Sequence, residues 1–207
     1  MLTGQVIPNK VIDDNVLSAF GDVAREAFVP TALKGVAYTD TSISLGAGRY
    51  MMEPMKMARL IAAADIAPSD VILNVGCGTG YSSAVLSKLG EVVVGLESDD
   101  ALFQQATENL NEQAIDNAVV VQGPLSEGVE KQGPFDVIFV NGAVEILPTQ
   151  LIAQLADGGR LVTIYVEDGV GHGYKLQRTG DEVEGFNLFD AQTPIIPEFV
   201  KKADFAF

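Results

Sequence analysis

The chain of 207 residues is 47% hydrophobic and 20% charged, as is ordinary for one globular domain with a buried core. Its formal net charge of −15 disfavours DNA, RNA and anionic membranes as partners, because these polyanions would be repelled. The single cysteine excludes an internal disulfide and a thiolate-rich metal site, and we expect no metal ion. No secretion signal or membrane-spanning run is recognisable, so we expect a cytoplasmic protein.

The first part of the chain, residues 1–69, is expected to form helices and a substrate-side loop that pack on residues 70–207. Apolar side chains recur at helical spacing through residues 11–29, which predicts a helix. The stretch Thr39–Glu53 is rich in Gly, Ser and Met and only weakly patterned, so we expect a long loop there. Pro54 is predicted to begin the next helix, because its fixed φ suits the first helical turn.

From residue 70 onward, short apolar strands alternate with helices. The predicted strands are Val71–Val75, Val92–Leu96, Val119–Gln122, Phe135–Val140 and Arg160–Val166. The predicted helices are Tyr81–Leu89, Asp99–Asn111 with Ser98 as its N-cap, and Thr149–Leu155. Later strands are expected at Tyr174–Arg178, Glu182–Phe189 and Phe199–Phe207. This pattern predicts an α/β fold with a doubly wound, mostly parallel seven-stranded sheet, a helical N-terminal extension and an antiparallel C-terminal edge.

Three glycines follow the first of these strands at alternate positions, Gly76, Gly78 and Gly80, and a helix begins directly after them. Glycine is needed here because the chain turns sharply and because its backbone must approach a ligand without a Cβ between them. The next strand is followed by Glu97. In doubly wound sheets an acidic residue at that place accepts hydrogen bonds from both hydroxyls of a ribose.

The spacing of the glycines distinguishes between cofactors. Dinucleotide loops read G-x-G-x-x-G, whereas the third glycine here comes one residue earlier, and the Lys-Ser/Thr pair of a phosphate loop is missing. The spacing G-x-G-x-G is typical of S-adenosylmethionine, so residues 70–207 are predicted to bind that cofactor in a Rossmann-like methyltransferase fold. A tight turn without a ligand is the structural alternative. The residues expected at the cofactor are Gly76, Cys77, Gly78, Thr79, Gly80, Glu97, Ser98, Gly123 and Asn141, with Cys77 a small buried residue.

Five segments carry a resemblance to a known family. They are Arg25–Pro30 (R-E-x-F-V-P), Ala37–Asp40 (A-Y-x-D), Val71–Tyr81 (G-x-G-x-G-Y), Pro134–Val140 (P-F-D-x-I-x-V) and Leu151–Val162 (L-x-x-Q-L-x-x-G-G-R-L-V). Together they resemble the protein-L-isoaspartate O-methyltransferases over about residues 11–166, in that family's order and spacing. The resemblance implies transfer of a methyl group from S-adenosylmethionine to the carboxylate of isoaspartyl residues in damaged proteins or peptides, with S-adenosylhomocysteine as product.

The substrate loop departs from the family pattern. Where the family reads T-I-S-Q-P, this chain reads Tyr50-Met51-Met52-Glu53-Pro54, so Met52 replaces the serine implicated in catalysis. Asn74 replaces the glutamate of the first strand, and Gly123-Pro124-Leu125 replaces G-D-G. The candidate catalytic positions are Arg49, Tyr50, Met52 and Glu53: Arg49 suits a carboxylate, whereas Glu53 would repel one. We therefore expect weak isoaspartyl activity, which Met52→Ser should raise.

Alternative functions are a methyltransferase of this fold with another acceptor, and a cofactor-binding protein with weak or no catalysis. A nicotinamide oxidoreductase is disfavoured by the glycine spacing. A nucleic-acid base methyltransferase is disfavoured because Asn141–Val144 lacks the Asn/Asp-Pro-Pro-aromatic pattern. The one histidine, His172, is predicted to be a loop residue without a role in catalysis. Methyl transfer to an ionised carboxylate needs alignment more than acid–base groups, and the oligomeric state is left open.

Overall fold

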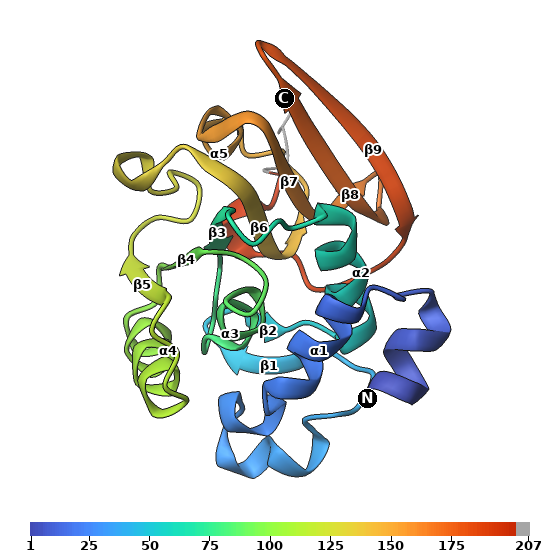
Figure 1. Ribbon diagram of the computed structural model, residues 1–207, viewed down its shortest axis with the longest axis vertical. Coiled ribbons are helices and arrows are strands. Elements are labelled where there is room, and N and C mark those ends of the chain that lie inside the picture. Colours follow the sequence, from blue (N-terminus) through green and yellow to red (C-terminus); the bar gives the residue numbers. More distant parts are fainter. Residues whose placement is uncertain (202–207) are drawn as a thin grey trace, which may run out of the picture.

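The computed structural model describes residues 1–201 and contains one seven-stranded sheet with helices on both faces (Figure 1). The strand order is β5-β4-β3-β6-β7-β8-β9. The five strands from β5 to β7 are parallel to their neighbours, and β8 and β9 add the antiparallel edge. The predicted fold class is therefore confirmed. The strands are β3 (Val71–Val75), β4 (Val92–Glu97), β5 (Ala118–Gln122), β6 (Phe135–Val144), β7 (Leu155–Glu167), β8 (Val170–Thr179) and β9 (Glu182–Asp190).

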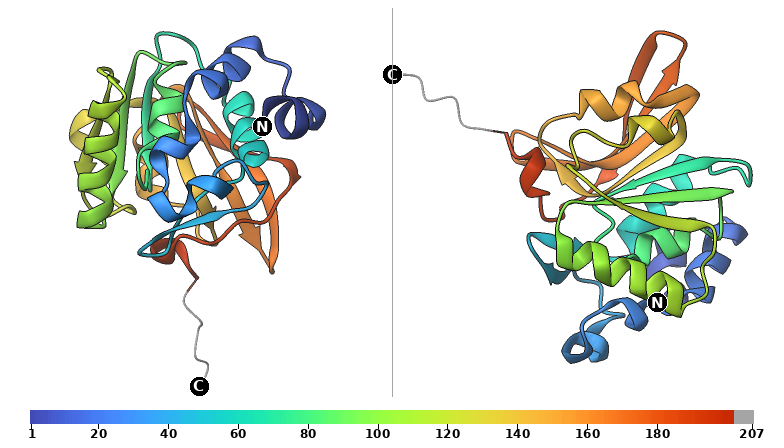
Figure 2. Two further views of the ribbon diagram at one scale, coloured as in Figure 1. Left: turned by 90° about the horizontal axis from the view of Figure 1, so that it is seen from below. Right: turned by 90° about the vertical axis from the view of Figure 1, so that its left-hand side faces the viewer.

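The two faces of the sheet are covered by different helices (Figure 2). Successive strand residues point to opposite faces, so Ile72 and Leu73 belong to different hydrophobic clusters. The cluster with Ile72 is completed by α1 to α4, and the cluster with Leu73 by α5 and the C-terminal residues up to Phe199. The helices are α1 (Asp14–Asp22), α2 (Pro54–Ala64), α3 (Tyr81–Leu86), α4 (Asp100–Glu112) and α5 (Thr149–Ala153).

The N-terminal region is less helical than predicted. Within residues 11–29, α1 covers only Asp14–Asp22, because Asp13 caps its start and Val23 is extended. The remainder forms a 3-10 turn, η3 (Arg25–Phe28). Further short helical turns are η1 (Leu2–Val6), η2 (Ile7–Asn9), η4 (Thr31–Val36), η5 (Glu130–Gln132) and η6 (Pro197–Phe199).

The prediction of a long loop over Thr39–Glu53 was wrong. This stretch contains an antiparallel hairpin, β1 (Ile43–Gly46) and β2 (Arg49–Met51). Its turn residues have φ values of +91° at Gly46, +49° at Ala47 and +71° at Gly48. The glycines that made the stretch look like a loop form the tight turn of a hairpin. Gly46 and Gly48 supply two of the three positive φ values in this turn, and glycine adopts such values without strain.

Three further local predictions need correction. The cap of α4 is Asp99, whose carboxylate accepts from the backbone N–H of Leu102 (3.0 Å), and Ser98 makes other contacts. His172 lies in β8, with its Nδ1 3.1 Å from Asp190 Oδ1 on β9. Phe199 ends a 3-10 turn, so the predicted strand Phe199–Phe207 is wrong at its start, and its positions 202–207 lie outside the described residues.

Candidate cofactor and substrate site

The predicted glycine loop joins β3 to α3 at the carboxyl edge of the central strands. The φ values of Gly76, Gly78 and Gly80 are +70°, +58° and +95°, all in the left-handed region that side chains with a Cβ disfavour. Backbone N–H groups of Gly76 and Cys77 donate to the carbonyl of Leu96 at the end of β4 (2.9 and 3.2 Å). The loop is therefore held against the strand that ends in Glu97.

Glu97 lies at the end of β4 and is completely buried. One carboxylate oxygen accepts from the N–H of Gly78 (2.9 Å), and the other accepts from the N–H groups of Ser98 and Asp99 (2.8 and 3.2 Å). The structure thus brings the glycine loop and the predicted ribose-binding carboxylate into direct contact. Backbone N–H groups stabilise the ionised carboxylate in this buried place.

Arg49 of β2 lies in this same half of the site, with only 3% of its surface exposed. Its Nε donates to Glu97 (3.1 Å), and its Nη2 donates to Ser98 Oγ (2.8 Å) and to Glu198 (2.6 Å). The guanidinium, which was predicted to meet a substrate carboxylate, is therefore paired with two carboxylates of its own chain. It links the substrate loop to the cofactor half of the site.

The other predicted cofactor residues make contacts that hold the loop in place. The hydroxyl of Thr79 donates to the carbonyl of Phe28 (2.6 Å). Asn141, on β6, donates to the carbonyl of Gly76 (3.1 Å), and the N–H of Gly123 donates to the carbonyl of Glu97 (3.0 Å). Thr79 and Asn141 thus hold the glycine loop, and Gly123 holds the end of β4; their contact with a cofactor stays a prediction.

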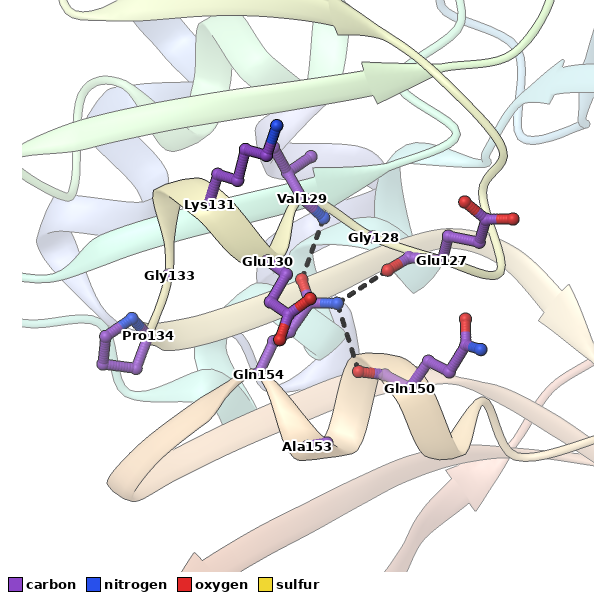
Figure 3. Close-up of a pocket in the computed structure, with 10 residues that line it drawn as sticks. All are labelled: Glu127, Gly128, Val129, Glu130, Lys131, Gly133, Pro134, Gln150, Ala153 and Gln154. Carbon is purple, nitrogen blue, oxygen red and sulfur yellow. Dashed lines mark hydrogen bonds between the residues drawn. The ribbon is translucent and has the colours of Figure 1, made fainter.

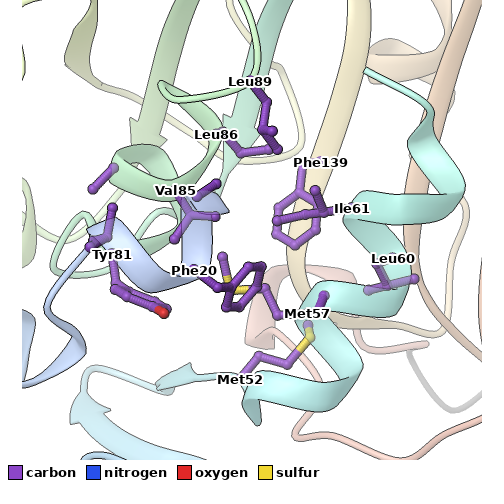
Figure 4. Packing of buried hydrophobic residues seen from close by; sticks show 14 of the residues in the cluster. Phe20, Met52, Met57, Leu60, Ile61, Tyr81, Val85, Leu86, Leu89 and Phe139 are labelled. Atoms are coloured by element: carbon purple, nitrogen blue, oxygen red, sulfur yellow. The ribbon is translucent and has the colours of Figure 1, made fainter. Parts of the chain in front are cut away.

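Met52, at the position of the family's serine, lies where the core meets this site, because it lines a small cavity together with Arg49 and Asn141. Its side chain is 1% exposed and packs with Phe20, Met57 and Tyr81 in the core between the sheet and α1–α3 (Figure 4). A side chain at this position is therefore a core residue. The sequence contained this signal, because Met51 and Met52 precede a helix with an apolar face.

Tyr50 and Glu53 line an open groove of about 510 Å³ next to the hairpin, together with Asp40 and residues 192–194. One oxygen of Glu53 accepts from Lys56 Nζ (2.7 Å), and the other has no partner within residues 1–201. Of the two carboxylates at the groove, Glu53 is paired with Lys56, so Asp40 contributes most of the negative charge there. This groove is the candidate entrance for a methyl acceptor.

Two side chains that the sequence did not suggest, Leu45 and Ile196, lie over the glycine loop, and a third, Glu198, reaches the site through Arg49. A Cβ built on Gly78 would lie 2.8 Å from Leu45 of β1, and one built on Gly76 would lie 3.4 Å from Ile196. Glu198 adds the contact to Arg49. No sequence signal connects Ile196 and Glu198 to a loop more than 100 residues earlier, because only the tertiary fold brings these segments together.

The sequence profile of the protein-L-isoaspartate(D-aspartate) O-methyltransferase family matches residues 2–184. The chain belongs to this family. Two curated relatives named protein-L-isoaspartate O-methyltransferase illustrate the similarity. The Koribacter versatilis protein is 38% identical over 162 residues, which are 78% of this chain and 73% of that protein. The Roseiflexus castenholzii protein is 34% identical over 192 residues, which are 92% of this chain and 88% of that protein.

Solved structures of the protein-L-isoaspartate O-methyltransferases share the fold. A Plasmodium falciparum structure with that name, in complex with S-adenosyl-L-homocysteine, aligns with a TM-score of 0.79 and 24% identity over 93% of this chain and 94% of that one. Another structure of that name aligns with a TM-score of 0.78 and 24% identity. It covers 89% of this chain, which spans only 61% of that longer chain.

Three segments that carry the family resemblance meet at Arg25. This fully buried side chain donates to the carbonyls of Ala37 (2.7 Å) and Met52 (2.6 Å), and its guanidinium lies 4.9 Å from the centre of the Tyr81 ring. Burial lowers the pKa of Arg25. Through these contacts Arg25 fixes the backbone of the substrate loop against α3. They also explain why three motifs occur in one chain, namely R-E-x-F-V-P, A-Y-x-D and the tyrosine after the glycines.

The glutamine of the family-like segment Leu151–Val162 has a structural role. Gln154 accepts from the N–H of Val129 (2.8 Å) and donates to the carbonyls of Glu127 (2.7 Å) and Gln150 (3.2 Å), as Figure 3 shows. It lies at an open hollow of about 730 Å³ beside η5 and α5, near the first residue of β6. The glycine loop lies at the other ends of the strands, so this hollow is separate from the candidate site.

The described part of the chain contains neither a candidate metal site nor a helix that could span a membrane. Within residues 1–201, no group of three or more His, Cys, Asp or Glu side chains is arranged to hold a metal ion. None of the helices in that range combines the length and apolar character needed to cross a bilayer.

Cys77 is expected to be inert to thiol reagents in the folded protein. Its side chain is 2% exposed, and burial together with the nearby Glu97 carboxylate raises the pKa of its thiol. Ellman's reagent at pH 8 should give less than a tenth of an equivalent within minutes, and one equivalent after addition of denaturant. Rapid full reaction of the native protein would show that the glycine loop opens readily.

Proposed function

We propose that this family member transfers a methyl group from S-adenosylmethionine to the free carboxylate of isoaspartyl residues in proteins or peptides. The observation that supports this most is the contact between the glycine loop and Glu97. Three left-handed glycines lie against a buried carboxylate at the end of the neighbouring strand. This is the arrangement that a ribose-containing ligand uses in doubly wound sheets.

The residue types at this place suit the cofactor. The backbone of Gly76–Gly80 would lie along its amino-acid part, and Glu97 would accept from its ribose hydroxyls. When bound, S-adenosylmethionine supplies the electrophilic methyl group. The acceptor carboxylate is ionised at neutral pH, so the chain need not provide a general base, and its contribution is alignment of the two reactants and exclusion of water. The single cysteine is compatible with a cytoplasmic location.

The test is methyl transfer from labelled S-adenosylmethionine to a synthetic isoaspartyl peptide, run beside the normal aspartyl peptide. We expect label on the isoaspartyl peptide at least tenfold above the aspartyl one, and none with Gly78→Val, whose branched side chain strains the loop. Because Arg49 is already paired with Glu97 and Glu198, turnover should be about two orders of magnitude below that of a relative with serine in the loop. Equal labelling of both peptides would contradict the proposed acceptor.

A second candidate function, a cofactor-binding protein with little catalysis, is favoured by Arg49. This cation is the group best suited to hold an acceptor carboxylate, and it is already neutralised by Glu97 and Glu198. Binding of S-adenosylhomocysteine without transfer to either peptide would favour this candidate over the first.

A further inference from the structure

The segment after β9 returns across the sheet toward the cofactor site. We call residues 191–200 the strap. Its backbone pairs with residues at the end of β6 and just after it: Ile196 N–H donates to Ala143 (2.9 Å), Ala143 N–H donates to Pro194 (3.2 Å), and Glu145 N–H donates to Phe199 (3.0 Å). Figure 2 shows this last segment, in red, beside the β1–β2 hairpin.

The strap meets the hairpin directly above the glycine loop. A Cβ on Gly48, in the hairpin turn, would lie 2.6 Å from the ring of Pro197, and one on Gly142 would lie 2.6 Å from Ile196. The Ile196 side chain also lies over Gly76. Two glycines are thus needed to admit the strap, in addition to those of the loop itself. The strap is closely packed in this position.

The space that remains between strap, hairpin and β6 is very small. A cavity of about 10 Å³ lies among Arg49, Asn141, Gly142 and Ile196. That volume holds about one water molecule, whereas small-molecule sites measure roughly 300–1,000 Å³. Thr193 and Pro194 line this cavity and also the open groove on the hairpin side. The strap is therefore the wall between the groove and the space over the glycine loop.

Charge contributes to the closure. The Arg49 guanidinium joins Glu97 below to Glu198 on the strap, and Ser98 Oγ donates to the same Glu198 oxygen (2.7 Å). Burial alone would raise the pKa of Glu198, but the hydrogen bonds from Arg49 and Ser98 lower it, so its carboxylate is ionised at neutral pH. Both oxygens of Glu97 already have donors. The oxygen that Arg49 contacts also accepts from two backbone N–H groups, so a ribose that uses both oxygens would have to displace Arg49 from that one.

We propose that the strap and Arg49 close the cofactor site, so that S-adenosylmethionine or S-adenosylhomocysteine binds only after the Glu198–Arg49–Glu97 bridge has opened and the strap has moved. This inference rests on the proposed function, because it concerns the same cofactor site. The bridge crosses three segments that are far apart in the chain, and with the Ser98–Glu198 hydrogen bond it joins the strap to the glycine-loop half. The closed form thus competes with the cofactor.

Competition of this kind has a measurable consequence. The apparent affinity of a ligand falls by the fraction of molecules that are in the binding-competent form. A substitution that destabilises the closed form therefore lowers the apparent Kd, although it removes a native contact. An ordinary loss of packing near the site would instead weaken binding, so the sign of the change identifies the closure.

The first experiment is titration calorimetry with S-adenosylhomocysteine on the full chain and on Glu198→Gln. We expect the apparent Kd of Glu198→Gln to be at least threefold lower, because the bridge to Arg49 loses its charge while the side chain keeps its shape. Ile196→Ala should act in the same direction, provided that it folds. Glu184→Gln, an equal change of charge on exposed β9, is the matched control and should leave the Kd unchanged.

The second experiment is hydrogen exchange of the full chain with and without saturating S-adenosylhomocysteine. We expect exchange in the peptide covering the strap to rise at least threefold when the ligand binds, while the peptide covering Gly76–Gly80 becomes slower. Without ligand, Glu198→Gln alone should also raise exchange in the strap, and Glu184→Gln should not.

The outcomes separate this inference from the proposed function. Binding of S-adenosylhomocysteine to the full chain with unchanged exchange in the strap, and an equal Kd for Glu198→Gln, would overturn the closure and leave the proposed function intact. Failure of both the full chain and Glu198→Gln to bind would overturn both. Tighter binding by Glu198→Gln together with faster exchange in the strap supports both.

Discussion

Replacing Glu97 with alanine is expected to weaken S-adenosylhomocysteine binding and to lower the free energy of unfolding by about 3 kcal/mol. The stability falls because Arg49, 3% exposed, keeps only its contacts to Glu198 and Ser98, and one-sided removal of a buried ion pair is strongly destabilising. A lost hydrogen bond to a charged group weakens binding by about 10- to 150-fold. We expect a weakening of about tenfold, the lower end of this range, because the substitution also destabilises the closed form, which competes with the ligand. Calorimetry and urea unfolding measure the two effects.

The matched control is the double substitution Glu97→Ala with Arg49→Met. Removing both charges of a buried pair is far less costly than removing one, so we expect most of the stability to return. Cofactor affinity should remain low, because the ribose still lacks its carboxylate. An affinity of Glu97→Ala equal to that of the unaltered chain would show that Glu97 is only a structural partner of Arg49 and the glycine loop.

Met52→Ser is expected to lower the free energy of unfolding by about 2–5 kcal/mol and not to raise isoaspartyl transfer. The side chain is 1% exposed in the core, so the substitution leaves a cavity and buries a hydroxyl. The pattern of the family loop alone suggested the opposite, a gain of activity from a restored serine. The buried position changes that expectation, because the shorter side chain would disturb the packing that holds the substrate loop in place.

Met55→Ser provides the comparison for Met52→Ser, since Met55 lies three residues later, in the first turn of α2, and is only partly buried. We expect it to cost less than half as much stability in urea unfolding. If Met52→Ser instead raised the rate of isoaspartyl transfer more than tenfold without loss of stability, the substrate loop must adopt another conformation during turnover.

The part of the site that could be predicted from the sequence is the part made by local patterns. A strand, three glycines and a helix follow one another within residues 71–86, and Glu97 follows the next strand. Each of these depends on backbone preferences and hydrophobic period, which act over a few residues. The mostly parallel sheet follows from the repetition of such units.

The closure of the site could not be predicted in this way. Arg49 meets Glu198 across 149 residues, and no local propensity records such a contact. The hairpin was missed because its strands have only four and three residues, so no alternating pattern had room to develop. Ser98 looked like a helix cap because serine is a good one, but the carboxylate of Asp99 takes that role and frees Ser98 for Glu198.

The most direct test of the account is the crystal structure of the full chain with S-adenosylhomocysteine. We predict the ligand over Gly76–Gly80 with its ribose hydroxyls on Glu97, Arg49 released from that carboxylate, and Ile196 and Glu198 moved away from the loop. A ligand bound elsewhere would contradict the assignment of the site. A ligand bound at the glycine loop beside an unchanged Glu198–Arg49–Glu97 bridge would contradict the closure.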